Sequence, residues 1–184
     1  MELTLIYGPM FSGKSKKLID FHNEIFSKYG EKSILAVKPN IDTRTQNFIF
    51  SRDYETKIFA HNIENSNGLY EKMHNQIEFI FIDEAHFFDV SFVGALKKLN
   101  KKTYVSCLDK TYQAEKWKIF PKLLGVATNK IKLTAQCYYK NCQNPATLSI
   151  KRNGGNNVVE VDDIENSIYC ASCKKHYFEI VRVK

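Results

Sequence analysis

The sequence predicts an α/β fold built on a mainly parallel sheet that helices cover on both faces. Apolar runs typical of buried strands alternate with segments of helical spacing along the first 130 residues. Polar residues directly follow several of these runs, and ligands of α/β proteins bind at such strand ends. Beyond this point the chain becomes β-rich and holds four of its five cysteines. We therefore expect an α/β domain over residues 1–130 and a small metal-binding domain over residues 131–184.

The apolar runs and the spacing of apolar residues place the individual elements. Strands are expected over residues 3–7, 33–37, 78–82 and 102–108, with a short one at 57–59. Helices are expected over residues 14–28, 68–74 and 89–99, with Gly30 ending the first and Asp89 capping the last. Cys107 falls inside the strand at 102–108, so we interpret it as a small core residue.

The first strand leads into a loop that fits the phosphate-binding pattern G-x-x-x-x-G-K-[ST]. The loop comprises Gly8, Pro9, Met10, Phe11, Ser12, Gly13, Lys14 and Ser15. Its glycines allow successive backbone N–H groups to point at phosphate oxygens. Lys14 is then placed to reach the outer phosphates of a bound nucleotide, and the Ser15 hydroxyl to ligate Mg²⁺. The alternative, a chance glycine-rich turn, does not explain why a strand precedes the loop and a helix follows it.

Two acids, Asp83 and Glu84, follow the apolar run at residues 78–82. The first is expected to face the Mg²⁺ held by Ser15, and the second is placed to abstract a proton or orient a nucleophile. The tetrapeptide Asp83-Glu-Ala-His86 also permits an interpretation as a DEAH-type helicase motor. Such motors need two motor domains, and 184 residues supply only one.

The cysteines predict a structural zinc site. They form a C-x₄-C pair and a C-x₂-C pair, Cys137 with Cys142 and Cys170 with Cys173. Both spacings occur in closed four-cysteine zinc sites, and an odd total in a chain without a secretion signal argues against disulfides. Four reduced thiols in a small core are the alternative. His176 follows the second pair, and we interpret it as a surface residue because four cysteines already saturate the metal.

Composition narrows the class of protein further. Hydrophobic residues make up 43% and charged residues 26% of the chain, as in soluble globular proteins. No apolar run approaches the roughly 20 residues of a membrane span, and no signal peptide is apparent, so we expect a cytoplasmic protein without membrane contact. The net charge of +7 suits a protein that handles polyphosphates. Nucleic-acid binding, the alternative explanation, lacks a supporting aromatic motif or basic helical stripe.

Together these motifs resemble the type II thymidine kinases, a family of cellular, bacterial and large-DNA-virus enzymes with a zinc-bearing lasso domain. The resemblance rests on residues 8–15, 38–44, 83–88, 108–113, 132–135 and 159–161, together with the four cysteines. It implies a RecA-like P-loop domain plus the lasso, assembled as a homotetramer. It also implies an ATP-dependent thymidine kinase of nucleotide salvage that uses Mg²⁺ and is inhibited by thymidine triphosphate (dTTP).

The resemblance also implies roles for individual residues. Glu84 takes the position of the base that removes the proton from the thymidine 5′-OH. Asp83 and Ser15 would hold Mg²⁺, while Asp42 and Arg44 would lie beside the transferred phosphoryl group. The nucleoside pocket would be formed by Met10, Phe87, Leu108, Tyr112, Trp117 and Ser149, by the backbone of Val159 and Val161, and by Tyr169.

The chain departs from the family pattern mainly in the lasso. His86 stands where many members carry glutamine, and Trp117 near a position that is usually phenylalanine. The aromatic that stacks on the nucleoside, four positions before the third cysteine, is replaced by Asn166, and Tyr169 is expected to substitute for it. The departures in the lasso motivate one alternative, a kinase for a related deoxynucleoside. The positive charge motivates another, a nucleotide-dependent nucleic-acid-binding protein.

Overall fold

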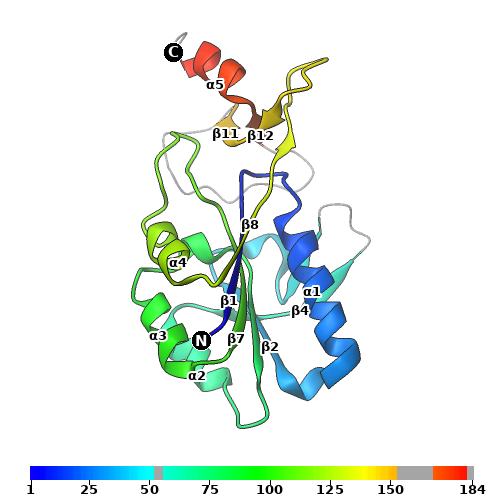
Figure 1. Ribbon diagram of the computed structural model, residues 1–184, viewed down its shortest axis with the longest axis vertical. Coiled ribbons are helices and arrows are strands. Elements are labelled where there is room, and N and C mark those ends of the chain that lie inside the picture. The colour runs from blue at the N-terminus through cyan, green and yellow to red at the C-terminus, as the bar shows by residue number, and fades with distance from the viewer. Residues whose placement is uncertain (52–55, 153–167, 182–184) are drawn as a thin grey trace.

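A six-stranded parallel sheet forms the centre of the computed structural model, which describes residues 1–51, 56–152 and 168–181 (Figure 1). Its spatial order is β5-β2-β6-β7-β1-β8, and every neighbouring pair of strands is parallel. The strands are β1 (Leu3–Tyr7), β2 (Ile34–Pro39), β5 (His61–Ile63), β6 (Phe79–Ile82), β7 (Lys102–Cys107) and β8 (Asn129–Lys132). The predicted α/β fold with a mainly parallel sheet is confirmed.

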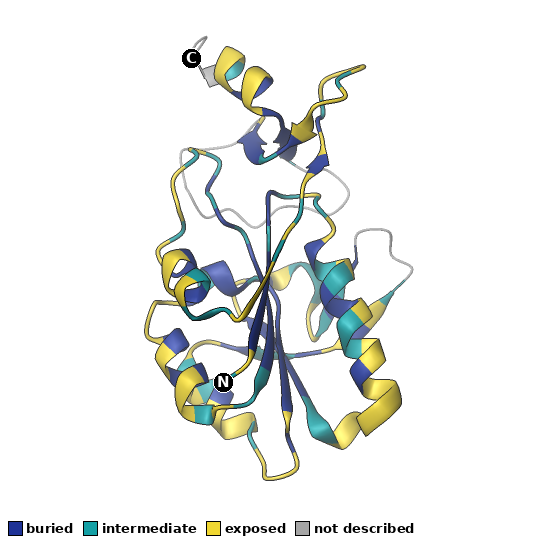
Figure 2. Cartoon of the chain, in the orientation of Figure 1, coloured by how far each residue is buried: buried dark blue, intermediate teal, exposed yellow. Residues whose placement is uncertain are grey.

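Alternate side chains of the central strands enter two separate cores, because successive residues of a strand point to opposite faces. Leu5 packs into one core, which α2 (Ser66–Lys72), α3 (Phe92–Leu99) and α4 (Phe120–Val126) cover. Ile6 packs into the other, beneath α1 (Lys14–Tyr29) and the hairpin of β3 (Phe48–Phe50) and β4 (Lys57–Phe59). Figure 2 shows buried positions along the sheet and exposed positions on the outer helix faces. The helices therefore cover both faces of the sheet.

A smaller β-rich part follows β8 and lies at one end of the long axis (Figure 1). It contains the strands β9 (Ala135–Gln136), β10 (Pro145–Ala146), β11 (Leu148–Lys151) and β12 (Tyr169–Ser172), and the helix α5 (Lys174–Val181). β9 pairs with β10 and β11 with β12, both antiparallel. The predicted boundary near residue 130 falls inside β8, which pairs with β1. A division of the chain into two domains at that point stays a prediction.

Three short 3₁₀ helices complete the described elements. They are η1 (Glu31–Ser33), η2 (Thr43–Thr45) and η3 (Ala85–Phe87). The last two lie directly beyond the carboxyl ends of β2 and β6, so they shape the edge of the sheet where the candidate site lies. Across the described ranges, we find no helix with the length and hydropathy of a membrane span.

Candidate active site and metal site

The candidate active site lies at the carboxyl edge of the parallel sheet. The loop of residues 8–15 joins β1 to α1, Asp83 and Glu84 follow β6, and Asp42 follows β2. Because parallel strands end at the same edge, segments far apart in the chain meet there. The predicted site residues from the first half of the chain are thus brought together by topology.

The loop of residues 8–15 depends on glycine at its first position. A Cβ on Gly8 would lie 2.3 Å from the carbonyl oxygen of Leu133, just beyond β8, so no larger residue fits. Gly13, in the left-handed conformation with φ 78°, forms the N-cap of α1. Lys14 is buried and its Nζ donates to the carbonyl of Pro9 at 2.7 Å. Burial lowers the pKa of Lys14, and its charge is directed into the loop.

Asp83 lies beside the helical end of this loop. The Ser15 hydroxyl donates to its Oδ2 at 2.9 Å, and the Ser106 hydroxyl from β7 donates to its Oδ1. Burial, together with the neighbouring Glu84 charge, raises the pKa of Asp83 to about 6, although both hydroxyls oppose the shift. A carboxylate and a hydroxyl in contact are the hard oxygen ligands that Mg²⁺ prefers. These two residues therefore fit a magnesium ion.

Glu84 differs sharply from its neighbour. It adopts the left-handed conformation, with φ 50° and ψ 37°, which is strained for a residue with a Cβ. Arg44 donates from Nη2 to Glu84 and from Nε to Asp42, each at 2.5 Å. Burial, the largest single influence, raises the pKa of Glu84, but Arg44 and the other groups around the carboxylate together outweigh it and hold that pKa well below its usual range. In this geometry Glu84 is an ionised carboxylate that forms an ion pair with Arg44.

Lys38 extends this arrangement and is a residue that the sequence analysis did not assign. Only 1% exposed, it lies on β2 with its Nζ 3.0 Å from Asp42 Oδ2. The same Nζ donates to the Thr45 hydroxyl at 2.7 Å. Lys38, Asp42, Arg44 and Glu84 therefore form a chain of alternating charges, which we call the charge chain. The one signal for it in the sequence is a lysine at the end of an apolar run.

His86 lies behind Glu84 rather than at the surface. It is 4% exposed, and the backbone N–H of Leu108 donates to its Nδ1 at 3.4 Å. Burial lowers the pKa of His86 to about 4, against the opposing charge of Glu84. Its ring contacts those of Phe87 and Trp117, with centroids 4.1 and 4.7 Å away. A neutral His86 therefore forms part of an aromatic cluster beside the acids.

The predicted nucleoside-pocket residues fall into two groups. Phe87, Leu108 and Trp117 gather around His86, and the Phe87 and Trp117 rings lie 5.7 Å apart. Tyr112 and Tyr169 lie together nearer the β-rich part, with ring centroids 6.4 Å apart. The hydroxyl of Ser149, on β11, accepts from the backbone N–H of Met10 at 3.0 Å and so joins the two parts. The predicted contacts at Val159 and Val161 lie outside the described residues.

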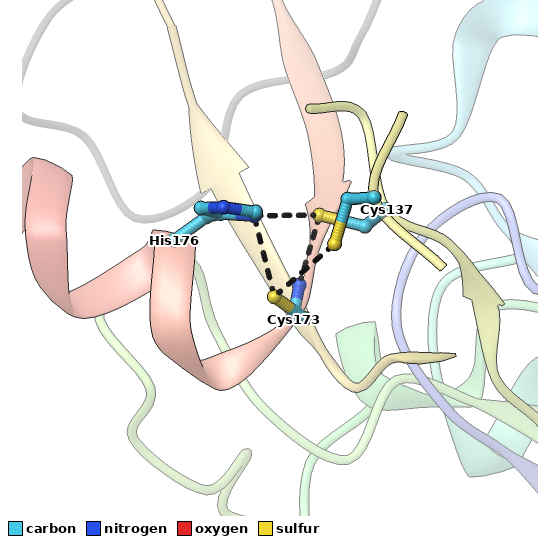
Figure 3. Close-up of side chains that lie close together, drawn as sticks. Cys137, Cys173 and His176 are labelled. Carbon is cyan, nitrogen blue, oxygen red and sulfur yellow. Dashed lines mark hydrogen bonds between the residues drawn. The ribbon is translucent and has the colours of Figure 1, made fainter. Parts of the chain in front are cut away.

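Four side chains of the β-rich part form a cluster that fits a zinc ion. The ligand atoms of Cys137, Cys142, Cys173 and His176 all lie within 4.8 Å of one another. Figure 3 shows the sulfurs of Cys137 and Cys173 facing the His176 ring, each 3.4 Å from its Nδ1. Three thiolates and one imidazole form a common tetrahedral zinc site. His176 is buried, which corrects its interpretation as a surface residue.

Cys170, predicted as one of the four cysteine ligands, lies outside this cluster. It is in strand β12, where it packs with Leu148, Ile150 and Tyr177. Ala171, next in the strand, instead packs with Cys137 and Cys173 on the other side. The period-2 alternation of a strand thus separates Cys170 from Cys173. His176 replaces it because the first turn of α5 brings a residue three positions after Cys173 back towards the sulfur.

This correction changes how the lasso compares with the family pattern. The third ligand is Cys173, so the position four residues before it is Tyr169 and no longer Asn166, which lies outside the described residues. With Cys173 counted as the third ligand, the position of the family's stacking aromatic is thus occupied by Tyr169, whose ring centroid lies 6.4 Å from that of Tyr112.

Fold and site together define a class of protein. A parallel α/β sheet carries a glycine loop with a buried lysine, and a hydroxyl–carboxylate pair beside a second acid, as is typical of nucleotide-dependent phosphotransferases. The family model described as "Thymidine kinase" matches residues 1–177. The chain therefore belongs to the thymidine kinase family.

Individual relatives agree with this assignment. The chain is similar to a thymidine kinase of Metamycoplasma arthritidis, with 33% identity over 94% of this chain and 88% of the relative. The match to a thymidine kinase of Mycoplasma genitalium is 32% identical over 94% of this chain and 81% of the relative. The match to a thymidine kinase of Mycoplasma mobile is 30% identical over 96% of this chain and 87% of the relative. A solved structure, domain III of the Thermotoga maritima replication initiation protein DnaA, aligns with a TM-score of only 0.38 at 14% identity, over 73% of this chain and 55% of that one.

Proposed function

We propose that the protein transfers the γ-phosphoryl group of Mg-ATP to the 5′-OH of thymidine, giving thymidine monophosphate. The observation that carries the proposal is the family match over residues 1–177. The geometry at the carboxyl edge of the sheet supports it, because a buried lysine, a serine–aspartate pair and a second acid converge there. Phosphoryl transfer depends mainly on positioning and charge stabilisation, and these are the groups that provide both.

The loop of residues 8–15 would act as the phosphate-binding P-loop. Its backbone N–H groups and the Lys14 ammonium would bind the phosphates of ATP, with Lys14 exchanging its contact to the Pro9 carbonyl for phosphate oxygens. Ser15 and Asp83 would hold Mg²⁺. When bound, Mg²⁺ neutralises charge on the β- and γ-phosphate oxygens. Asp83 must be ionised for this role, so its raised pKa predicts that Mg²⁺ binding weakens below about pH 6.

Glu84 would accept the proton of the nucleoside 5′-OH. In the described geometry Arg44 neutralises this carboxylate, which makes it a weak base. Phosphate groups compete with carboxylates for a guanidinium, because both accept two parallel hydrogen bonds. Bound ATP would therefore draw Arg44 away from Glu84, and the pKa of Glu84 would rise towards a value suited to a general base.

The nucleoside would occupy the space between the aromatic residues and the β-rich part. Met10, Phe87, Leu108, Tyr112 and Trp117 would form apolar walls, and Tyr169 would stack on the base. Ser149 already accepts a hydrogen bond from Met10, so its hydroxyl hydrogen remains to donate to a carbonyl of the base. The backbones of Val159 and Val161 would add hydrogen bonds. An apolar wall discriminates a single methyl group by only about 1–3 kcal/mol, which permits turnover of deoxyuridine.

The Cys3His cluster would hold a structural zinc ion. Four protein ligands fill the tetrahedral shell and leave no position for a substrate. Assembly as a homotetramer, inhibition by dTTP and a cytoplasmic location are further parts of this proposal, and the resemblance to the family supports each of them.

A steady-state assay of ADP release tests the proposal. Mg-ATP is supplied with thymidine, deoxyuridine, deoxycytidine or no nucleoside. We expect release that depends on the nucleoside and is fastest with thymidine. Fastest turnover of deoxycytidine would transfer the assignment to a related deoxynucleoside kinase. ADP release at the same rate with and without a nucleoside would contradict the proposal.

A further inference from the structure

One hydrogen bond links the helix that carries the metal ligand His176 to the predicted nucleoside pocket. Tyr177, only 3% exposed, donates from its hydroxyl to the backbone carbonyl of Tyr112 at 2.8 Å. The two residues are 65 positions apart in the chain. Neither the sequence analysis nor the proposed chemistry gives Tyr177 a role.

Tyr112 lies at the tip of a segment that returns on itself after β7. The backbone of Thr111 donates to the carbonyl of Glu115 at 2.8 Å, and that of Trp117 donates to the carbonyl of Asp109 at 3.4 Å. The tip itself projects towards the β-rich part, where Lys151 Nζ lies 5.3 Å from the centre of the Tyr112 ring. The Tyr177 hydroxyl therefore ties this tip to the β-rich part of the molecule.

The other end of the link is fixed by the Cys3His cluster. Cys173 directly precedes α5, and His176 directly precedes Tyr177 in its first turn. A metal ion bound to both ligands would hold this turn at a fixed angle to β12. The direction of the Tyr177 side chain would then be set by the metal shell, one residue away.

We propose that Tyr177 is a positioning residue that couples the Cys3His site to the nucleoside pocket. Through the Tyr112 carbonyl it fixes the Tyr112 ring opposite Tyr169, and so sets the affinity for the nucleoside without changing the phosphoryl-transfer step. This inference rests on the proposed function, because it takes Tyr112 as a wall of the thymidine pocket. On this proposal the bound metal would affect nucleoside affinity as well as the stability of the β-rich part.

The test uses the full-length, zinc-loaded protein with Tyr177→Phe, which removes one oxygen and leaves the ring in the core. Tyr139→Phe is the matched control, since Tyr139 stacks on His176 with centroids 4.1 Å apart but is 53% exposed. Thymidine binding is followed through the emission of Trp117, the single tryptophan of the chain. This readout needs no turnover.

We expect Tyr177→Phe to raise the thymidine Kd about 3- to 10-fold, the effect of one lost hydrogen bond. ATP affinity and zinc content should equal those of the native protein, and Tyr139→Phe should bind thymidine normally. An unchanged thymidine Kd in Tyr177→Phe would overturn the inference and leave the proposed function intact. If the native protein itself does not bind thymidine, the proposed function fails and the inference fails with it.

Metal removal supplies a second, independent measurement. If Tyr177 transmits the position of the metal shell, chelation should weaken thymidine binding more in the native protein than in Tyr177→Phe. Equal losses in both proteins would show that the metal acts by another route, and would contradict the coupling even where the variant alone has a raised Kd.

Discussion

Asp83 and Glu84 are neighbours in the chain, yet their surroundings move their pKa values in opposite directions. Asp83 is buried beside the negative charge of Glu84, so its pKa is raised to about 6. Glu84 is only partly exposed, and its burial alone would raise its pKa, but the groups around it, Arg44 foremost, hold that pKa below the usual range. Two adjacent carboxylates with separated pKa values suit two different tasks, and this agrees with the proposed roles of Asp83 in metal binding and Glu84 in proton transfer.

Asp83→Asn is expected to change how stability depends on pH. The pKa of Asp83 is higher in the folded protein than in the unfolded chain, so its protonated form stabilises the fold at low pH and this contribution disappears as pH rises through about 6. Relative to the native protein, the variant should gain about 2–3 kcal/mol between pH 4 and pH 7. Denaturant unfolding in the presence of a chelator measures this gain. If the free energies of unfolding of the two proteins changed with pH in parallel, the raised pKa of Asp83 would be contradicted.

Lys38 supplies one of the two positive charges that balance the two carboxylates of the charge chain. Its ammonium lies beside buried Asp42, so Lys38→Met leaves a carboxylate with one cation shared between two acids. Loss of a partner from a buried ion pair costs about 3–5 kcal/mol, and we expect a destabilisation of that order in urea. The double variant with Asp42→Asn should recover most of it. Lys32→Met, at an exposed lysine before β2, is the control; equal effects at both lysines would exclude a special role for Lys38.

At the scale of elements, the sequence predicts best where one physical signal dominates. Central strands such as β1 and β6 are apolar on both faces, and both were predicted to within a residue. The edge strands β5 and β8 are short and polar, so their sequences resemble loops. The charge chain could not be predicted, because its contacts depend on which strands are neighbours. The prediction of Cys170 as a zinc ligand was wrong because cysteine spacing alone does not show that Cys170 lies within a strand.

Two single substitutions test the corrected metal site. His176→Ala removes a ligand and should abolish stable zinc binding, whereas Cys170→Ser changes a thiol outside the cluster and should leave the zinc content unchanged. Elemental analysis of protein purified without chelator measures both. Zinc lost from Cys170→Ser and kept by His176→Ala would restore the four-cysteine arrangement.

At the scale of the whole molecule, two hydrogen bonds between described residues connect the α/β part to the β-rich part at the candidate site. Met10 of the loop after β1 donates to Ser149, and Tyr177 of α5 donates to Tyr112. Each bond joins a segment that we propose to bind the nucleotide or the nucleoside with a strand or helix of the β-rich part. If the cluster holds the proposed structural zinc ion, these two bonds connect that metal site to the candidate active site.

The central claim is that this edge of the sheet transfers a phosphoryl group with Glu84 as the base. Glu84→Gln keeps the size of the side chain and removes its ability to accept a proton. We would measure thymidine-dependent turnover beside the Kd values of ATP and thymidine. Turnover should fall at least about 100-fold, while both Kd values stay within about threefold of the native ones. Turnover equal to that of the native protein would show that Glu84 is not the base.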